Sequence, residues 1–193
     1  MNNERFLQFL QHNGLVSEPA AHQIAGHFMP RELARHEFFL KAGKVSQEYL
    51  FLEKGFMRAF AYDTDGNEVT TNFYTGNQVV FEVSSFFNRT PSRENIQAMV
   101  QCSGWSITFE QLNHLFHALP AFREFGRSVL VKGYAALKSS MLAMITETAE
   151  ARYAHLLETK PELFQYAQLK HIASYLGVTD SSLSRIRKEF SKK

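Results

Sequence analysis

Hydrophobic positions change their spacing twice along this chain, and the changes divide it into three segments. Residues 4–28 have the spacing of short helices, residues 31–110 that of short strands, and helical spacing returns from residue 110 onward. The strand-like runs are separated by turn residues such as Asp65-Gly66, and lie near 37–40, 48–53, 56–62, 68–74, 78–82, 94–101 and 104–109. Short strands at near-regular spacing predict an antiparallel sandwich or barrel. The predicted fold class is therefore α+β, with an antiparallel β-roll of jelly-roll type.

A long helix is predicted to follow the β-roll. After a short amphipathic helix over residues 110–119, helical spacing extends over residues 121–150 and carries an apolar seam at steps of four and three, formed by Leu130, Tyr134, Leu137, Met141 and Met144. About 27 helical residues make a rod ~40 Å long. A rod with one apolar stripe needs a partner, so the seam predicts pairing of two copies. The alternative is that the stripe packs onto the β domain of its own chain.

The C-terminal segment, residues 168–189, has the pattern of a helix-turn-helix. The first helix is predicted to end at Leu176, where Gly177 suits a backbone of positive φ. Thr179 or Asp180 is then expected to cap the second helix. The buried faces are predicted to comprise Ile172, Ala173, Leu176, Val178, Leu183 and Ile186. In this motif the second helix enters a DNA major groove. A plain helical hairpin with a solvated polar face is the alternative.

The outer face of this motif is rich in hydroxyls and cations, which are the groups that contact DNA. Ser181 and Ser182 stand at a helix start, where backbone N–H groups favour a phosphate or a base edge. Arg187 suits a phosphate contact or a solvated position, and Lys170 is a phosphate candidate. The candidate DNA-binding residues are Lys170, Thr179, Asp180, Ser181, Ser182, Ser184, Arg185, Arg187 and Lys188.

Composition agrees with a DNA-binding C-terminal end. The 193 residues allow one or two domains and carry a net charge of +2. Residues 151–193 have a net charge of +4 and residues 1–150 one of −2, although a solvated basic tail gives the same balance. The single cysteine, Cys102, gives no support to disulfides, and the N-terminus is unlike a signal peptide. No apolar run approaches the ~18 residues of a membrane span, so a cytoplasmic protein without a membrane partner is expected.

The order of these elements and several local motifs resemble the Crp/Fnr (catabolite activator) family of bacterial transcription regulators. In the C-terminal half the resemblance is carried by Arg152-Tyr153, Leu156-Leu157, Pro161, residues 169–177 and residues 183–187. In the β-roll it is carried by Ala42-Gly43, residues 49–55, Arg58 and residues 65–68. The resemblance implies a cyclic-nucleotide-binding-like sensor domain over residues 1–120, a dimerisation helix over 121–150 and a DNA-binding domain over 151–193.

The resemblance further implies how such a protein would work. A homodimer would bind an inverted-repeat operator in double-stranded DNA under control of a small-molecule effector, with RNA polymerase as a candidate partner. Arg185 matches the base-reading arginine of the family, and a guanidinium can pair with guanine through two hydrogen bonds. Asp180 and Ser181 replace other family residues, so a different operator sequence is expected.

The effector pocket departs from the pattern of the family. In members that bind cyclic nucleotides, a Gly-Glu-Leu element holds the ribose and an arginine on the next strand clamps the phosphate. Here the first element reads Phe81-Glu82-Val83 and the second contains Ser92-Arg93-Glu94. Strand alternation places Ser92 and Glu94 inward and Arg93 outward. Our hypothesis is that cyclic AMP is not bound in the usual way, unless a one-residue bulge turns Arg93 inward.

A second departure concerns the C-terminus. Family members usually continue from the recognition helix into a β-hairpin wing, whereas this sequence ends at Ser191-Lys192-Lys193. A truncated helix-turn-helix without the wing is expected, with Lys188, Lys192 and Lys193 replacing some phosphate contacts.

Little in the sequence suggests catalysis. There is no glycine-rich phosphate loop, and one cysteine excludes a cysteine-ligated iron–sulfur cluster. His114 and His117 could share a metal on a helix, but two exposed histidines are the simpler interpretation. We expect no catalytic residues, no metal and no cofactor. The two other functions considered are a small-molecule sensor that has lost tight DNA binding and, more distantly, a cupin-type enzyme.

Overall fold

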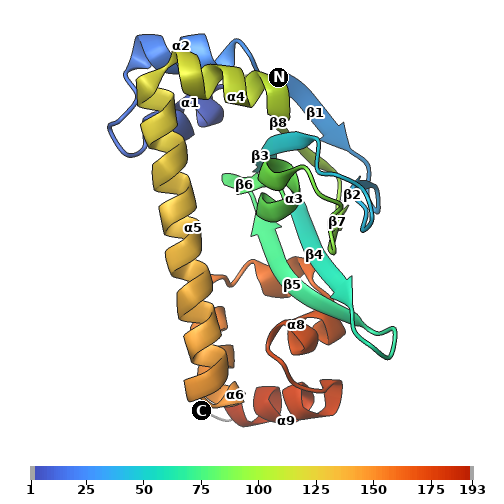
Figure 1. The fold of residues 1–193 in the computed structure, drawn as a ribbon. Coiled ribbons are helices and arrows are strands. Elements are labelled where there is room, and N and C mark those ends of the chain that lie inside the picture. Colours follow the sequence, from blue (N-terminus) through green and yellow to red (C-terminus); the bar gives the residue numbers. More distant parts are fainter. Residues whose placement is uncertain (1–2, 192–193) are drawn as a thin grey trace.

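The computed structural model describes residues 3–191, and its centre is a sandwich of two four-stranded antiparallel sheets (Figure 1). The first sheet has the order β1-β8-β3-β6 and the second the order β2-β7-β4-β5. The strands are β1 (Met29–Leu33), β2 (Phe38–Leu40), β3 (Glu48–Lys54), β4 (Phe56–Tyr62), β5 (Glu68–Thr75), β6 (Gln78–Val80), β7 (Asn95–Ala98) and β8 (Cys102–Thr108). The predicted β-roll is therefore confirmed.

Three helices and the beginning of a fourth cover one end of this sandwich. They are α1 (Glu4–Gln11), α2 (Glu18–Ala25), α4 (Phe109–Ala118) and the first turns of α5 (Pro120–Thr146). Phe6 of α1 stacks on Phe51 of β3 with ring centroids 5.0 Å apart, and Phe122 and Phe125 of α5 are buried in the same cluster. Each fully buried phenylalanine contributes about 1.5–3 kcal/mol. This apolar cluster fixes the start of α5 to the β-roll.

The chain passes from the first sheet to the second at Gly55, between β3 and β4. Gly55 has φ +117°, and a Cβ there would lie 2.5 Å from Sγ of Cys102. Cys102 is 1 % exposed, and burial raises the pKa of its thiol. A small residue is thus required at position 55, and Cys102 is a packing residue with little thiolate.

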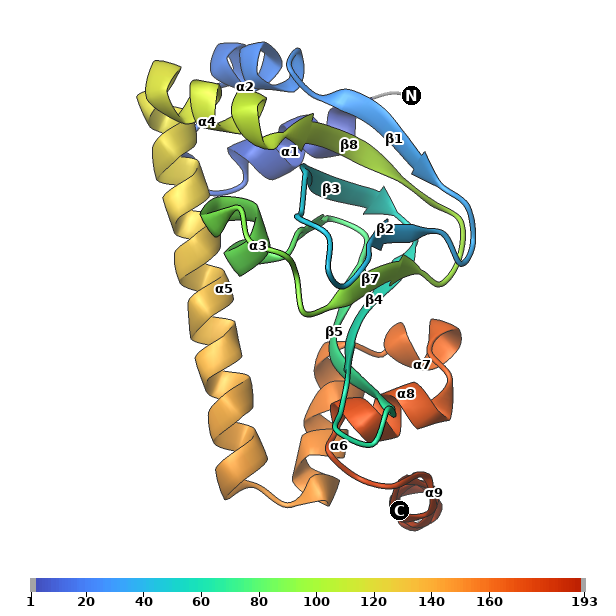
Figure 2. The same ribbon diagram turned by 45° about the vertical axis from the view of Figure 1, so that its right-hand side comes forward.

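The C-terminal third leaves the sandwich and returns to its opposite end. Helix α5 runs past the β-roll and ends at Thr146, after which the chain turns back through α6 (Ala149–Thr159), α7 (Leu163–Tyr166), α8 (Leu169–Tyr175) and α9 (Asp180–Phe190) (Figure 2). These helices form a second apolar cluster that includes Phe56 and Phe73 of the hairpin β4–β5. The helical C-terminal unit therefore packs against the far end of the β-roll.

Several boundaries differ from the sequence predictions for local reasons. The helical pattern predicted over 121–150 is broken at Glu147, because Thr148 accepts a hydrogen bond from Ala151 N and begins α6. Strand β1 and helix α3 (Val83–Asn88) were not predicted. The strand predicted over 94–101 is limited to β7, because Ser92 bonds both the N–H and the C=O of Glu94 in a turn before it.

Candidate DNA-binding surface and effector pocket

The turn between α8 and α9 has the geometry predicted from its sequence. Gly177 has φ +68°, and the N–H of Val178 donates to Ala173 O at 3.0 Å. Of the two candidate caps, Thr179 is the one used, since its Oγ1 accepts from Ser182 N at 3.2 Å. Glycine at this left-handed position avoids the steric cost of a side chain.

The predicted inner face is buried. Ile172, Ala173 and Leu183 are at most 1 % exposed, and Leu176 and Ile186 are also buried. Val178 is only partly buried beside them. Because Ala173 has no side chain beyond Cβ, α8 and α9 can approach closely. This packing holds α9 at a fixed angle to α8.

The outer face of α9 presents unpaired cations. Arg185, Arg187 and Lys188 are exposed, as is Lys170 at the start of α8. Within residues 3–191, none of these four side chains makes an ion pair. The predicted contacts Lys192 and Lys193 lie outside the described residues. A row of unneutralised positive charge is what attracts a phosphate backbone.

The hydroxyl groups at the start of α9 form a small cluster. Thr179 Oγ1 lies 3.0 Å from both Ser181 Oγ and Ser182 Oγ. Thr179, Asp180, Ser181 and Ser184 are exposed, whereas Ser182 is half-buried. The hydroxyls of Ser181 and Ser182 are therefore partly engaged within the chain, which the sequence prediction did not anticipate.

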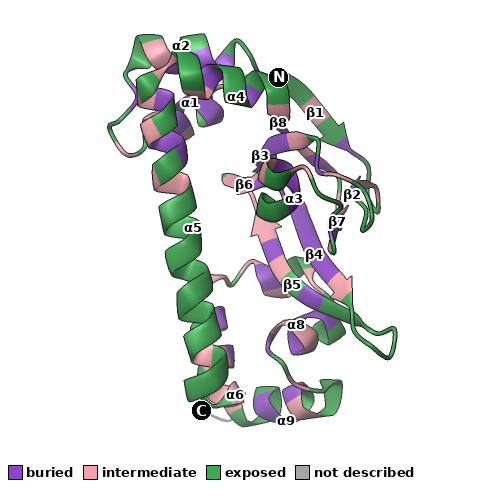
Figure 3. Cartoon of the chain, in the orientation of Figure 1, coloured by how far each residue is buried: buried purple, intermediate pink, exposed green. Residues whose placement is uncertain are grey.

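The seam predicted on α5 is exposed to solvent (Figure 3). Tyr134 and Leu137 are 71 % and 68 % exposed, and Leu130, Met141 and Met144 are also exposed. The alternative in which this stripe packs on the sheets of its own chain is thus not adopted. Helix α5 is also long and apolar enough, with a window of mean hydropathy 1.2, to meet the simple criteria for a membrane span, contrary to the sequence expectation.

The last seam residue has a second contact within the chain. A Cβ built on Gly177 would lie 2.6 Å from Cε of Met144, so Met144 rests against the turn of the helix-turn-helix. Arg152 of α6 connects the same regions, donating from Nη1 to Glu147 O at 2.6 Å and from Nη2 to Leu176 O at 2.8 Å. Met144 thus contacts this turn as well as belonging to the seam, and neither this contact nor the bridging role of Arg152 was predicted.

The first element of the expected effector pocket is satisfied within the chain. Glu82 caps α3, because its carboxylate accepts from Ser84 N at 3.0 Å and from Ser85 N at 2.6 Å. Phe81 points into the apolar cluster, 5.0 Å from the ring of Tyr49, and Val83 is exposed. The first N–H groups of α3 thus already donate to the Glu82 carboxylate of the protein itself.

The second element is anionic and lacks an inward cation. Arg93 is exposed and Glu94 is half-buried. Burial raises the pKa of Glu94, a hydrogen bond with Thr71 opposes this shift, and the Glu82 charge adds to it. Ser92 is buried as predicted, but it lies in the turn before β7, so strand alternation is not the reason. Arg93 lies before β7 and is exposed, and the irregularity in the pairing of β7 with β2 falls between Phe38 and Leu40, so no bulge turns Arg93 inward.

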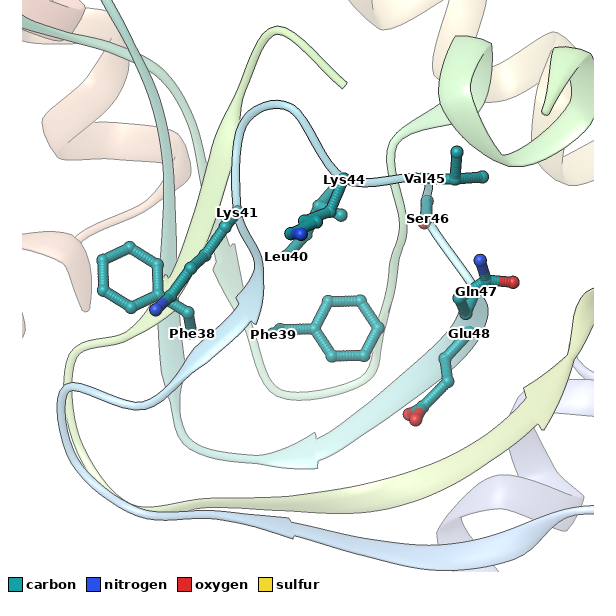
Figure 4. Close-up of a pocket in the computed structure, with 9 residues that line it drawn as sticks. All are labelled: Phe38, Phe39, Leu40, Lys41, Lys44, Val45, Ser46, Gln47 and Glu48. Carbon is teal, nitrogen blue, oxygen red and sulfur yellow. The ribbon is translucent and has the colours of Figure 1, made fainter. Parts of the chain in front are cut away.

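A separate open hollow lies at the loop between β2 and β3 (Figure 4). It has a volume of about 300 Å³ and is lined by residues 38–41 and 44–48. The ammonium group of Lys41 lies 5.1 Å from the ring centre of Phe38, and the carboxylate of Glu48 stands on the opposite side. None of the six predicted effector residues lines this hollow.

Comparison with known proteins identifies the architecture. Residues 30–118 match the family described as the cyclic nucleotide-binding domain. The chain is similar to FixK2 from Bradyrhizobium japonicum, with 16 % identity, a TM-score of 0.74, and 86 % of this chain and 85 % of that one covered. The chain has the Crp/Fnr fold. The resemblance found in the sequence is confirmed at this level.

Two further solved structures share this fold, and only one of them is described with an effector. The regulator CLP from Xanthomonas campestris, described as responsive to c-di-GMP, has 16 % identity and a TM-score of 0.69 over 89 % of this chain and 90 % of its own. A Crp/Fnr-family transcriptional regulator from Eubacterium rectale has 12 % identity and a TM-score of 0.72, with 95 % of this chain and 88 % of its own covered. A search of curated proteins gives no match.

Proposed function

We propose that this protein is a homodimeric, sequence-specific DNA-binding transcription regulator of the cytoplasm, and that RNA polymerase is among its partners. The observation that carries the proposal is that the exposed cations Arg185, Arg187 and Lys188 make no ion pair within residues 3–191, on a helix whose inner face is packed. A rigid helix with cations on its free face suits entry into a major groove. The regulators with the same fold support this assignment.

In this proposal α9 is the recognition helix and Arg185 reads a base. A guanidinium can bond O6 and N7 of guanine together, whereas the other candidate residues position the helix on phosphates. Lys170 and the hydroxyl cluster of Thr179, Ser181 and Ser182 would contact the backbone, with Asp180, Ser184, Arg187 and Lys188 at the edge of the same surface. A two-fold dimer predicts an inverted repeat with half-sites ~34 Å apart.

The dimer is proposed to form along α5. Its exposed apolar stripe is continuous over several turns, and two such helices would remove it from water. Leu137→Glu should shift the protein from dimer to monomer in sedimentation velocity, while Ser139→Glu on the opposite face of α5 should leave the dimer intact. Monomeric wild-type protein at high concentration would contradict this part of the proposal, as would association only with lipid vesicles.

The effector is proposed to be something other than cyclic AMP bound in the usual way. Glu82 is engaged as a helix cap, Glu94 adds an anionic group, and Arg93 faces solvent, so a cyclic phosphate meets repulsion where it needs a cation. In the allosteric scheme, an effector in the β-roll would shift the population of orientations of the two recognition helices.

Selection of bound sequences from random duplex DNA tests the proposed function directly. The expected result is an enriched inverted repeat whose binding weakens as salt rises. If no sequence is enriched and no duplex is shifted in dilute buffer, DNA binding is refuted. The alternative, a small-molecule sensor without tight DNA binding, would then be favoured, and metal analysis of the purified protein would test the cupin-type enzyme.

A further inference from the structure

The helix-turn-helix unit is docked on the free edge of the second sheet. Strand β5 is the last strand of its sheet, and its outward N–H at Thr70 donates to Ser174 Oγ of α8 at 2.9 Å. The same hydroxyl lies 3.4 Å from Glu68 O. Tyr175 packs on Phe73 with ring centroids 5.3 Å apart. Helix α8 thus covers an edge that would otherwise be open to water.

A buried arginine lies beneath this contact. Arg58 of β4 is 1 % exposed. Its Nε donates to Thr70 Oγ1 at 2.9 Å, and its Nη1 donates to Glu68 Oε2 at 2.6 Å. Its Nη2 is buried and has no hydrogen-bond partner within residues 3–191. One edge of the guanidinium is therefore neutralised, while the other is left with unsatisfied donor capacity.

His171 of α8 is the titratable group of the same interface. It is 7 % exposed, and its Nδ1 is buried without a hydrogen-bond partner in the described chain. Burial, together with the charges of Arg58 and Lys170, lowers the pKa of His171 to about 4, although Glu68 and Asp180 act in the opposite direction. These four charged groups come from β4, β5, α8 and the start of α9. The docked imidazole is thus kept neutral.

We propose that His171 makes the docking of the helix-turn-helix unit on the β4–β5 hairpin sensitive to pH, because a protonated imidazole cannot be accommodated beside the buried Arg58. Neutral His171 is compatible with the docked arrangement. An imidazolium would add a second buried cation to an interface in which the carboxylate of Glu68 already pairs with Arg58. Acid therefore favours the arrangement in which α8 has moved away from β5.

The direction of the effect follows from proton linkage. When α8 moves away, His171 regains its ordinary pKa near 6.5, so the separated state binds a proton that the docked state excludes. Docking is at full strength above this value and weakens as the pH falls toward 4. We expect the docking equilibrium to fall about twentyfold between pH 7 and pH 5. Regulation of DNA binding by this route rests on the proposed function, but the docking itself does not.

Hydrogen exchange at the Thr70 amide measures the docking without DNA. Protection, corrected for the intrinsic exchange rate, should fall about twentyfold from pH 7 to pH 5 in the wild type. His171→Gln, which cannot titrate, should show the same protection at both pH values. His155→Gln, an exposed histidine of α6, should behave as the wild type does. Equal losses of protection in His171→Gln and the wild type would overturn the proposal.

A second measurement applies even if His171→Gln fails to fold. In the wild-type protein, the imidazole resonance of His171 followed by NMR should titrate well below the ordinary histidine value of 6.5. Titration of His171 at or above that value would also overturn the proposal. Since neither measurement contains DNA, a failed DNA selection together with the expected pH response would refute the proposed function alone.

Discussion

The helix-turn-helix and the effector region are separate parts of the molecule, and they treat their polar groups in opposite ways. On α9, cations stand on the outer face without partners in the described chain. In the effector region, Glu82 is bonded to the start of α3 and Ser92 closes a turn on Glu94. Polar groups left free are available to a ligand, whereas polar groups paired internally stabilise the fold. The first region is thus prepared for a partner and the second is largely complete by itself.

Arg185→Ala tests this comparison most strongly, because it is expected to have the largest effect on DNA affinity. Loss of a two-bond contact with guanine should weaken specific DNA binding by about 1–3 kcal/mol, which is roughly 5- to 150-fold. Binding to an unrelated duplex should change little. Affinity measurements on both duplexes, with Arg187→Ala as the matched variant, would check this. An equal loss on both duplexes would make Arg185 a phosphate contact instead.

A smaller effect is expected from Gly177→Ala at the turn. The left-handed φ costs a side chain about 1–2 kcal/mol of folding free energy, and Met144 must also move. Gly66→Ala is the control, because Gly66 has φ +82° with no atom within 4 Å of the added Cβ. Denaturant unfolding should show a greater loss for Gly177→Ala than for Gly66→Ala. Equal losses would mean that Met144 does not restrict the turn.

In the effector region, Glu82→Ala should cost about 1 kcal/mol of folding stability, because the cap of α3 is lost. Glu110→Ala is the comparison, since Glu110 also lies in a first helical turn but is exposed and is not the cap of α4. Chemical unfolding of both variants would check this. If Glu82→Ala were as stable as the wild type, the cap would contribute nothing to folding, and the Glu82 carboxylate of the wild type would be available to a ligand.

The smallest effect is expected from cyclic AMP or cyclic GMP. A ligand at 100 times its dissociation constant stabilises the folded state by about 2.7 kcal/mol. We expect no shift in the thermal midpoint at millimolar nucleotide, since Glu82 and Glu94 oppose an anion. A saturable rise in the midpoint, or micromolar affinity by calorimetry, would contradict the comparison between the two regions.

The helix-turn-helix was predictable because its signals are local. Gly177 marks the turn, Thr179 offers the cap, and the spacing of Leu183 and Ile186 defines the buried face of α9, all within a short span. The apolar stripe of α5 was predictable for the same reason. The contact between Met144 and the turn at Gly177 was not predictable, because it depends on how α6 and α8 fold back toward α5.

The effector region and the docking interface depend on residues distant in sequence. Strand alternation gave the correct burial of Ser92 for the wrong reason, because the turn before β7 is set by its pairing with the loop at Gly43 and Lys44. Helix α3 was missed because a six-residue helix offers little periodicity. The bond between Thr70 and Ser174 joins residues 104 positions apart, which no local pattern in the sequence reveals.

The burial of Cys102 against Gly55 has a practical consequence. As the single thiol of the chain, and one kept protonated and inaccessible, it should not react with maleimide or nitroxide reagents under native conditions. A cysteine introduced on the exposed face of α9, as in Ser184→Cys, can therefore be labelled selectively without removing a native residue. In the proposed dimer, spin-label distances between the two copies could then follow the separation of the two α9 helices as conditions change.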